Sequence, residues 1–218
     1  MSENMKNKGA IEYFHNRIEK FDDIYKESNS PFISFLNRTI RASVKARYQL
    51  AFEILGDLSG KSVLDIGCGS GRYMFKAAEK NASRIVGIDA AAGALEQAGK
   101  IANELGLKER MKFVESDFID FSADGKYDVI FAVGYFDYIF NPDVHMRKMI
   151  EFSDGLIYAS FPKVWSLFTI IRKIRLMLNR CPVRFYTKSR IKKLLQNLNV
   201  ENYDLKNVYR DYILIIRK

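Results

Sequence analysis

The chain has 218 residues, of which 48% are hydrophobic, 28% are charged and four are proline, a composition that suits one globular domain and excludes a long disordered tail. Its net charge of +9 is local, because the segment from Lys163 to Lys193 holds ten basic residues and no acidic one. Subtracting these ten charges leaves the rest of the chain at −1, so the charge belongs to one element and not to the whole protein.

A change in sequence period divides the chain into an N-terminal helical part and an α/β part. Residues 10–29 are typical of a polar helix, Pro31 marks a break, and an apolar stripe at helical spacing predicts a second helix over 32–58. Short buried strands then alternate with helices, which predicts a parallel sheet covered on both faces. The expected strands are 62–66, 84–89, 111–115, 127–133 and 155–160, and the expected helices run from the glycine turn to residue 80, over 91–105 and from residue 142 onward. Two β-rich runs, 199–205 and 209–217, are separated by Lys206 and Asn207, so a final hairpin should place the last strand antiparallel to its neighbours.

These elements predict an α/β fold with a doubly wound, mostly parallel sheet of seven strands whose last strand is antiparallel. The expected organisation is an N-terminal helical lid over 1–58 and a main domain over 59–218, with a basic lid insert at about 161–186. Because apolar runs are interrupted before the roughly 20 residues of a membrane span, and residues 1–10 lack an apolar signal region, we expect a cytoplasmic protein. Cys68 and Cys181 have no partner at a disulfide-framework or metal-ligand spacing, so no metal site is expected.

The segment VLDIGCGSGR (63–72) is the most informative motif. Gly67, Gly69 and Gly71 allow the backbone to pass close to a ligand between a strand end and a helix start. Glycines alone also suit a dinucleotide enzyme or a tight structural turn. Asp65, two residues before the first glycine, would repel a pyrophosphate but suits a ligand with ammonium and sulfonium centres.

Further acidic residues follow the next two strands. Asp89 ends the second strand, where a carboxylate can accept hydrogen bonds from both ribose hydroxyls. Asp117 and Phe118 follow the third strand and offer an acceptor for an adenine amino group and an aromatic face. Each acid alone is more often a cap or turn residue, but together they fall at the sheet edge where open α/β folds bind ligands.

With these motifs, GIDA (87–90), ESDFIDF (115–121) and KYDVIFAVGYFDYIFNP (126–142), residues 60–218 resemble the class I S-adenosylmethionine-dependent methyltransferases. The resemblance implies S-adenosylmethionine as cofactor, a Rossmann-like fold and an antiparallel seventh strand. It assigns the methionine part to Asp65, Gly67 and Gly69, the ribose to Asp89 and Ala90, the adenine to Asp117 and Phe118, and the sulfonium to Val133 and Gly134, and it adds Cys68 to the cofactor-binding residues. The flanks EYF (12–14) and SFPK (160–163), and a basic insert ending in Tyr186, are partly similar to magnesium-protoporphyrin O-methyltransferases.

Acceptor chemistry should depend on the residues after the fourth strand. Asp137 and Tyr138 fall where many small-molecule relatives carry a catalytic histidine, so they are the candidate catalytic residues, although Asp137 also suits an orienting or capping role. The Pro-Pro-aromatic motif of nucleic-acid amino-methylating relatives is absent there, so no specific nucleic-acid acceptor is expected. His15 and His145 are interpreted as surface or packed residues.

Three functions stay open at this stage. The first is methyl transfer to a small molecule, at oxygen, under a lid formed by residues 1–58 and 161–186. The second is methylation of RNA or protein through the basic segment, and the third is a non-catalytic module that binds S-adenosylmethionine. The basic, apolar helix expected after residue 160 either packs as a lid or contacts an anionic or lipid-linked acceptor or an acidic membrane surface.

Overall fold

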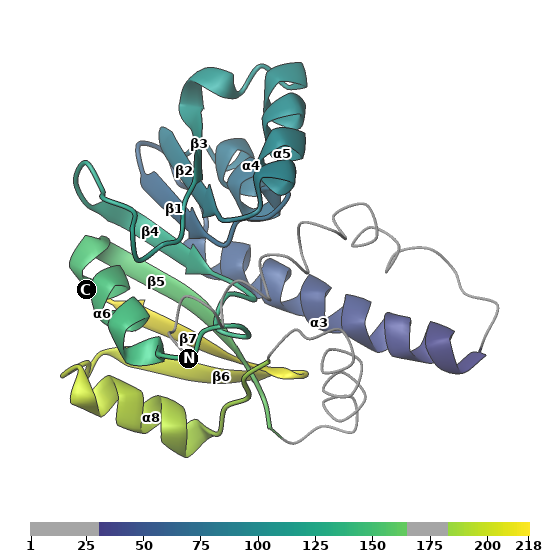
Figure 1. Cartoon of the computed structure of the whole chain (residues 1–218), viewed down its shortest axis with the longest axis vertical. Coiled ribbons are helices and arrows are strands. Elements are labelled where there is room, and N and C mark those ends of the chain that lie inside the picture. The colour runs from purple at the N-terminus through teal and green to yellow at the C-terminus, as the bar shows by residue number, and fades with distance from the viewer. Residues whose placement is uncertain (1–30, 165–182) are drawn as a thin grey trace.

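The computed structural model describes residues 31–164 and 183–218, which form one seven-stranded sheet with helices on both faces (Figure 1). The strands lie in the order β3-β2-β1-β4-β5-β7-β6. Their bounds are β1 (Ser62–Ile66), β2 (Arg84–Asp89), β3 (Met111–Glu115), β4 (Tyr127–Ala132), β5 (Ser153–Pro162), β6 (Tyr203–Val208) and β7 (Asp211–Arg217). The chain order reverses between β1 and β4, and this is the point where open α/β sheets bind ligands beyond the carboxyl ends of the strands.

The directions of the strands confirm the predicted topology. Neighbours from β3 through β5 pair in parallel, whereas β7 pairs antiparallel with both β5 and β6. The predicted hairpin is present, but its predicted turn is wrong: Lys206 and Asn207 lie inside β6, and the two-residue turn is Tyr209–Arg210. Tyr209 has φ 47°, a left-handed conformation that non-glycine residues rarely adopt, so its identity did not indicate a turn.

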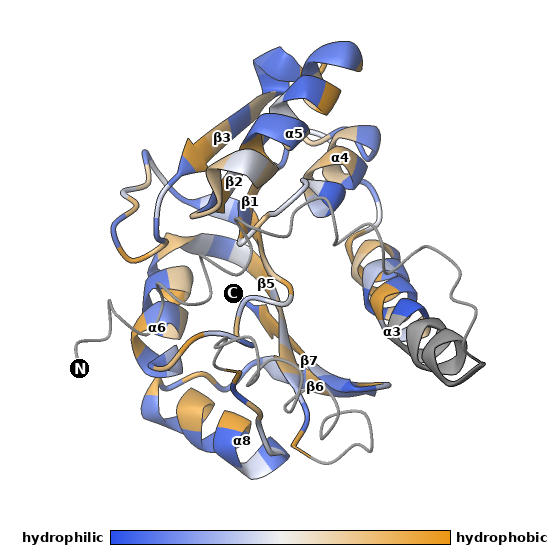
Figure 2. Ribbon diagram, turned by 45° about the vertical axis from the view of Figure 1, so that its right-hand side comes forward, coloured by the Kyte–Doolittle hydropathy of each residue, from blue (hydrophilic) through white to orange (hydrophobic). Residues whose placement is uncertain are grey.

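Two hydrophobic cores fill the two faces of the sheet, because successive side chains on a strand point to opposite sides. On β4, Ile130 and Ala132 belong to the core beneath α6 (Pro142–Phe152) and α8 (Lys188–Asn197). Val129 and Phe131 belong to the core beneath α3 (Pro31–Leu55), α4 (Arg72–Glu79) and α5 (Ala92–Glu104). The apolar colouring of the strands between these two helical layers is visible in Figure 2. The doubly wound arrangement is therefore confirmed.

The N-terminal helix α3 packs on the sheet at its carboxyl-terminal end, where Ala51 and Phe52 are buried, and extends past the sheet at its amino-terminal end (Figure 1). The predicted helix over 10–29 lies outside the described residues. No helix in the described ranges is both long and apolar enough to cross a membrane.

The basic segment divides into a described and an undescribed part. Residues 165–182 lie outside the described ranges, and so does most of the expected lid helix. Their two flanks meet, since the Tyr186 N–H donates to the Pro162 carbonyl (2.8 Å) and the Val164 N–H donates to the Tyr186 carbonyl (3.2 Å). The helix α8, which the sequence pattern did not predict as a separate helix, follows this segment. Thr187 is its N-cap, because the Thr187 hydroxyl accepts a hydrogen bond from the Arg190 N–H (3.2 Å).

Candidate functional site

The glycine turn lies at the carboxyl end of β1 and is fixed to β2. The N–H groups of Gly67 and Cys68 both donate to the Ile88 carbonyl (2.8 and 3.1 Å). Gly67, Gly69 and Gly71 have φ of 69°, 52° and 77°, so the turn needs the left-handed backbone that glycine adopts without strain. The Cys68 side chain is buried, and its sulfur lies close to where a Cβ on Gly87 would stand, so it packs beneath the turn.

Two of the three predicted carboxylates converge on this turn. Asp89 bridges two loops: one of its oxygens accepts from the Gly69 N–H (2.8 Å) and the other accepts from the Ala91 N–H (2.9 Å). Asp65 is almost fully buried, and its Oδ2 has no hydrogen-bond partner among the described residues. Burial, with the nearby charge of Asp89, raises the pKa of Asp65 to about 8. A buried carboxyl group without a partner is a group prepared for a cationic ligand.

The third acid is held by its own turn after β3. Asp117 Oδ1 accepts from the Ile119 N–H (3.1 Å), and the Ser116 N–H donates to the Asp89 carbonyl (3.1 Å), which ties the ends of β2 and β3 together. The Phe118 ring is only 2% exposed and packs edge-to-face on Phe152 of α6. The Phe118 ring thus packs against α6, and its expected contact with adenine stays a prediction.

Tyr135 and His145 form a pair that sequence reasoning missed. The Tyr135 hydroxyl is hydrogen-bonded to His145 Nδ1 at 2.6 Å, and Tyr135 Cδ2 lies 3.1 Å from where a Cβ on Gly67 would stand. Burial lowers the pKa of His145 to about 4, so the imidazole is neutral at pH 7. Burial raises the pKa of Tyr135 well above its usual value, with Asp117 and Asp89 adding to the shift. The ring thus lies within electrostatic reach of two of the predicted cofactor acids.

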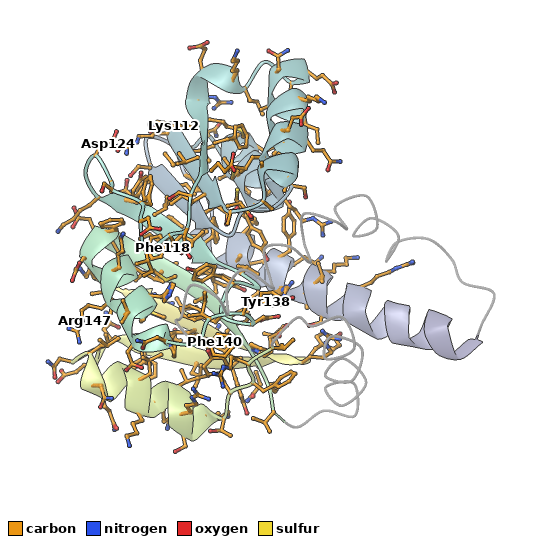
Figure 3. The ribbon with its side chains drawn as sticks, in the orientation of Figure 1. Lys112, Phe118, Asp124, Tyr138, Phe140 and Arg147 are labelled. Atoms are coloured by element: carbon orange, nitrogen blue, oxygen red, sulfur yellow. The ribbon has the colours of Figure 1, made fainter. Side chains whose placement is uncertain are left out.

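The loop after β4 carries the candidate catalytic residues. Gly134 has φ 78° and donates its N–H to the Ser160 hydroxyl (2.7 Å), which joins the ends of β4 and β5. Asp137 is buried, and its carbonyl accepts from the Arg184 N–H (2.7 Å) at the end of the basic insert. Tyr138 is half-buried and lies toward α3 in the view of Figure 3, whereas Phe118 lies toward α6. Asp137 therefore joins the β4 loop to the insert.

The arrangement is a sheet-edge site with a buried Asp65, a half-buried Asp89, a glycine turn and, among the residues described, no group of three metal-ligating side chains. A family model described as a methyltransferase domain matches residues 57–199. The chain therefore belongs to the methyltransferase domain family, which confirms the resemblance drawn from the motifs.

Relatives and solved structures agree with this family. Aklanonic acid methyltransferase of Streptomyces sp. is 38% identical over 94 residues, 42% of this chain and 41% of that protein, so the chain spans less than half of that relative. The magnesium protoporphyrin IX methyltransferase of Synechocystis with bound S-adenosylmethionine has a TM-score of 0.75 at 18% identity, over 98% of this chain and 97% of that one. The 1,6-didemethyltoxoflavin N1-methyltransferase of Burkholderia thailandensis has a TM-score of 0.74 at 15% identity, over 100% and 91% of the two chains. At these identities the two structures show that the fold is shared.

Proposed function

We propose that this protein is an S-adenosylmethionine-dependent methyltransferase that acts on a small molecule. The observation that carries the proposal is the buried Asp65, whose Oδ2 has no partner among the described residues, beside Asp89 at the glycine turn. A carboxyl group in this position can pair with an ammonium group, and Asp89 lies where its carboxylate would accept hydrogen bonds from the ribose hydroxyls. Asp117 would then hold the adenine amino group. The relatives with small-molecule names support the acceptor class.

Bound S-adenosylmethionine supplies an activated methyl group, which transfers by in-line displacement. The protein's task is then to hold the acceptor in line and to exclude water. Val133 and Gly134 directly follow β4, and Tyr135 of the same loop lies against Gly67, so an acceptor would rest on the loop from Tyr135 to Phe140. Asp137 and Tyr138 remain the candidates for accepting or orienting the acceptor proton, and oxygen is the proposed methylated atom.

Calorimetric titration with S-adenosylhomocysteine tests the cofactor assignment. We expect saturable binding at one site, and a loss of about tenfold or more for Asp89→Ala, which removes a charged acceptor. Asp204→Ala is a matched control because Asp204 is an exposed carboxylate paired with Arg217 at the far edge of the sheet. A wild-type protein that binds no S-adenosylhomocysteine would contradict the proposal.

The acceptor class is tested by incubating a cell extract with the protein and methyl-labelled S-adenosylmethionine. Label in low-molecular-weight material supports a small acceptor, and label in RNA or protein supports the alternative in which the basic segment holds a polymer. Salt adds a second criterion, because transfer to a nucleic acid falls steeply between 50 and 200 mM salt as counterions are released. Transfer to a small molecule should change far less over that range.

The described part of the basic segment supports an anionic acceptor or an anionic surface. On α8 the side chains of Lys188, Arg190, Lys192 and Lys193 are exposed, and this helix has no acidic residue in its first turn. Positively charged side chains near a helix N-terminus interact unfavourably with the helix dipole, so they lower the stability of the helix. An anionic ligand bound there would offset this cost. We propose that the protein is cytoplasmic and that the exposed basic side chains of α8 bind such a ligand. Flotation with anionic and neutral vesicles tests whether that ligand is a membrane.

A further inference from the structure

Two buried polar atoms beside the glycine turn have no partner in the described chain: Asp65 Oδ2 and the Tyr73 hydroxyl. Burial raises the pKa of Tyr73, Arg47 lowers it and Asp65 raises it, so Arg47 and Asp65 both lie within electrostatic reach of the Tyr73 hydroxyl. Buried polar groups in folded proteins are nearly always hydrogen-bonded. Two such groups at the predicted methionine end of the site indicate that a ligand completes them.

Tyr73 is otherwise a packing residue, which makes its hydroxyl informative. Its ring lies in an aromatic cluster with Tyr48, Phe52 and Phe131, at centroid distances of 5.4, 5.9 and 5.0 Å. This cluster joins α3, α4 and β4. A phenylalanine would fill the same space, so packing does not explain the hydroxyl.

Arg47 of α3 is held in place beside these atoms. Its Nη1 lies 3.4 Å from Asp211 Oδ2, which also accepts from the Ser43 hydroxyl (3.0 Å), and its carbonyl accepts from the Tyr158 hydroxyl (2.7 Å). Arg47 Nη2 lies 4.0 Å from where a Cβ on Gly134 would stand. A guanidinium has five N–H donors, so it can hold Asp211 and a second anion at once.

The cofactor proposed above has three charges on its methionine part. Asp65 fits the ammonium, and the end of β4 at Gly134 fits the sulfonium, which leaves the carboxylate. A carboxylate calls for a cation and hydroxyl donors, and Arg47 and Tyr73 offer these groups: Arg47 Nη2 lies 4.0 Å from the Cβ position of Gly134, and the charge of Asp65 acts on the Tyr73 hydroxyl.

We propose that Arg47 and Tyr73 bind the carboxylate of the amino-acid part of S-adenosylmethionine. The inference rests on the proposed function and adds to it, because α3 then supplies a cofactor contact from outside the glycine-turn motif. The helix α3, which was expected to form part of a lid, would thus also bind the negatively charged carboxylate of the cofactor.

The test compares two ligands that differ only in the carboxylate. Calorimetry would measure the Kd of S-adenosylhomocysteine and of its decarboxylated analogue for the full-length wild type, Tyr73→Phe, Arg47→Gln and Arg47→Lys. We expect Tyr73→Phe to weaken S-adenosylhomocysteine binding about fivefold and Arg47→Gln about thirtyfold, with partial recovery in Arg47→Lys. The decarboxylated analogue should bind wild type and variants alike.

Tyr48→Phe is the matched control, because Tyr48 lies in the same aromatic cluster while its hydroxyl is influenced by Lys76 and Glu79 on the outer side of α4. Its Kd should equal that of the wild type. Tyr73→Phe removes only an atom without a partner, so folding is preserved even if Arg47→Gln fails to fold.

Three results would overturn the inference. Variants that bind S-adenosylhomocysteine as tightly as the wild type would show that neither side chain contacts it, and equal losses for both ligands would assign the effect to another group. A change confined to the KM of the methyl acceptor would place the bound carboxylate on the acceptor. If the wild type itself binds no S-adenosylhomocysteine, the proposed function fails, which is a different outcome.

Discussion

At the scale of single residues, the protonation of Asp65 should be linked to cofactor binding. Burial and Asp89 hold the pKa of Asp65 at about 8, so the carboxyl group is mostly protonated at pH 7 in the free protein. A cationic ligand favours the carboxylate and lowers this pKa, so binding should release close to one proton and tighten as pH rises from 6.5 to 8. Titrations in two buffers of different ionisation enthalpy would count the protons. Asp65→Asn should release none, and a pH-independent Kd in the wild type would contradict the assignment.

His145 should make the protein sensitive to acid. Burial depresses the pKa of His145 in the folded state to about 4, while in the unfolded chain it is about 6.5. Between these values the unfolded state binds more protons, so stability falls as pH is lowered from 7 to 5, by about 2 kcal/mol from this group alone. Urea unfolding at the two pH values would measure the loss, and His145→Gln should lose less by roughly that amount. Equal losses in both proteins would show that another group titrates.

The residues that could be read from the sequence are those whose role follows from local position. Asp65 and Asp89 lie at the carboxyl ends of two neighbouring buried strands and the glycine turn directly follows the first, and parallel strands bring such ends to one edge. Arg47, Tyr73 and His145 follow no such pattern, because their neighbours are far away in sequence: Arg47 meets Asp211 across 164 residues. The edge-to-face packing of Phe118 on Phe152 of α6 likewise follows no local motif.

At the scale of elements, Gly155 fixes how closely β5 lies beside β4. A Cβ at Gly155 would collide with the backbone carbonyl of Asp128, at the irregularity in the pairing of β4 and β5. Backbone cannot give way as a side-chain tip can, so Gly155→Ala should destabilise the protein by about 2–3 kcal/mol in urea unfolding. Gly99→Ala in α5 is the control, since nothing lies within 4 Å of its Cβ position, and it should stabilise by about 0.5–1 kcal/mol. A neutral Gly155→Ala would show that the strands tolerate separation.

Element boundaries were predictable for some strands and not for others. The bounds of β1, β2 and β3 equal the predicted ones; β1 and β2 are buried along nearly their whole length, and β3 matches although Met111 is its only buried residue. In β6, exposed and half-buried positions alternate without a fully buried residue, so the sequence carried little signal for its register. Helix α8, which follows the insert, was not predicted because basic residues dominate its sequence, although Ile191, Leu194 and Leu195 form a buried stripe.

At the scale of the whole molecule, α3 and the sheet should unfold as one unit that the cofactor stabilises. The Tyr158 hydroxyl and the Asp211 carboxylate attach α3 to β5 and β7, while the glycine turn belongs to β1 and α4, so a ligand at the site acts on elements from both ends of the chain. S-adenosylhomocysteine at 100 times its Kd should stabilise the folded state by about 2.7 kcal/mol. For a chain of this size that raises Tm by roughly 5–10 °C. Far-UV and near-UV circular dichroism should agree on one midpoint in the absence of ligand and on one higher midpoint in its presence, and an Asp89→Ala variant that binds tenfold more weakly should show about half the wild-type shift at the same ligand concentration. Separate transitions for the two signals would mean that α3 is not part of the cooperative unit, and an unshifted wild-type midpoint would mean that no ligand binds.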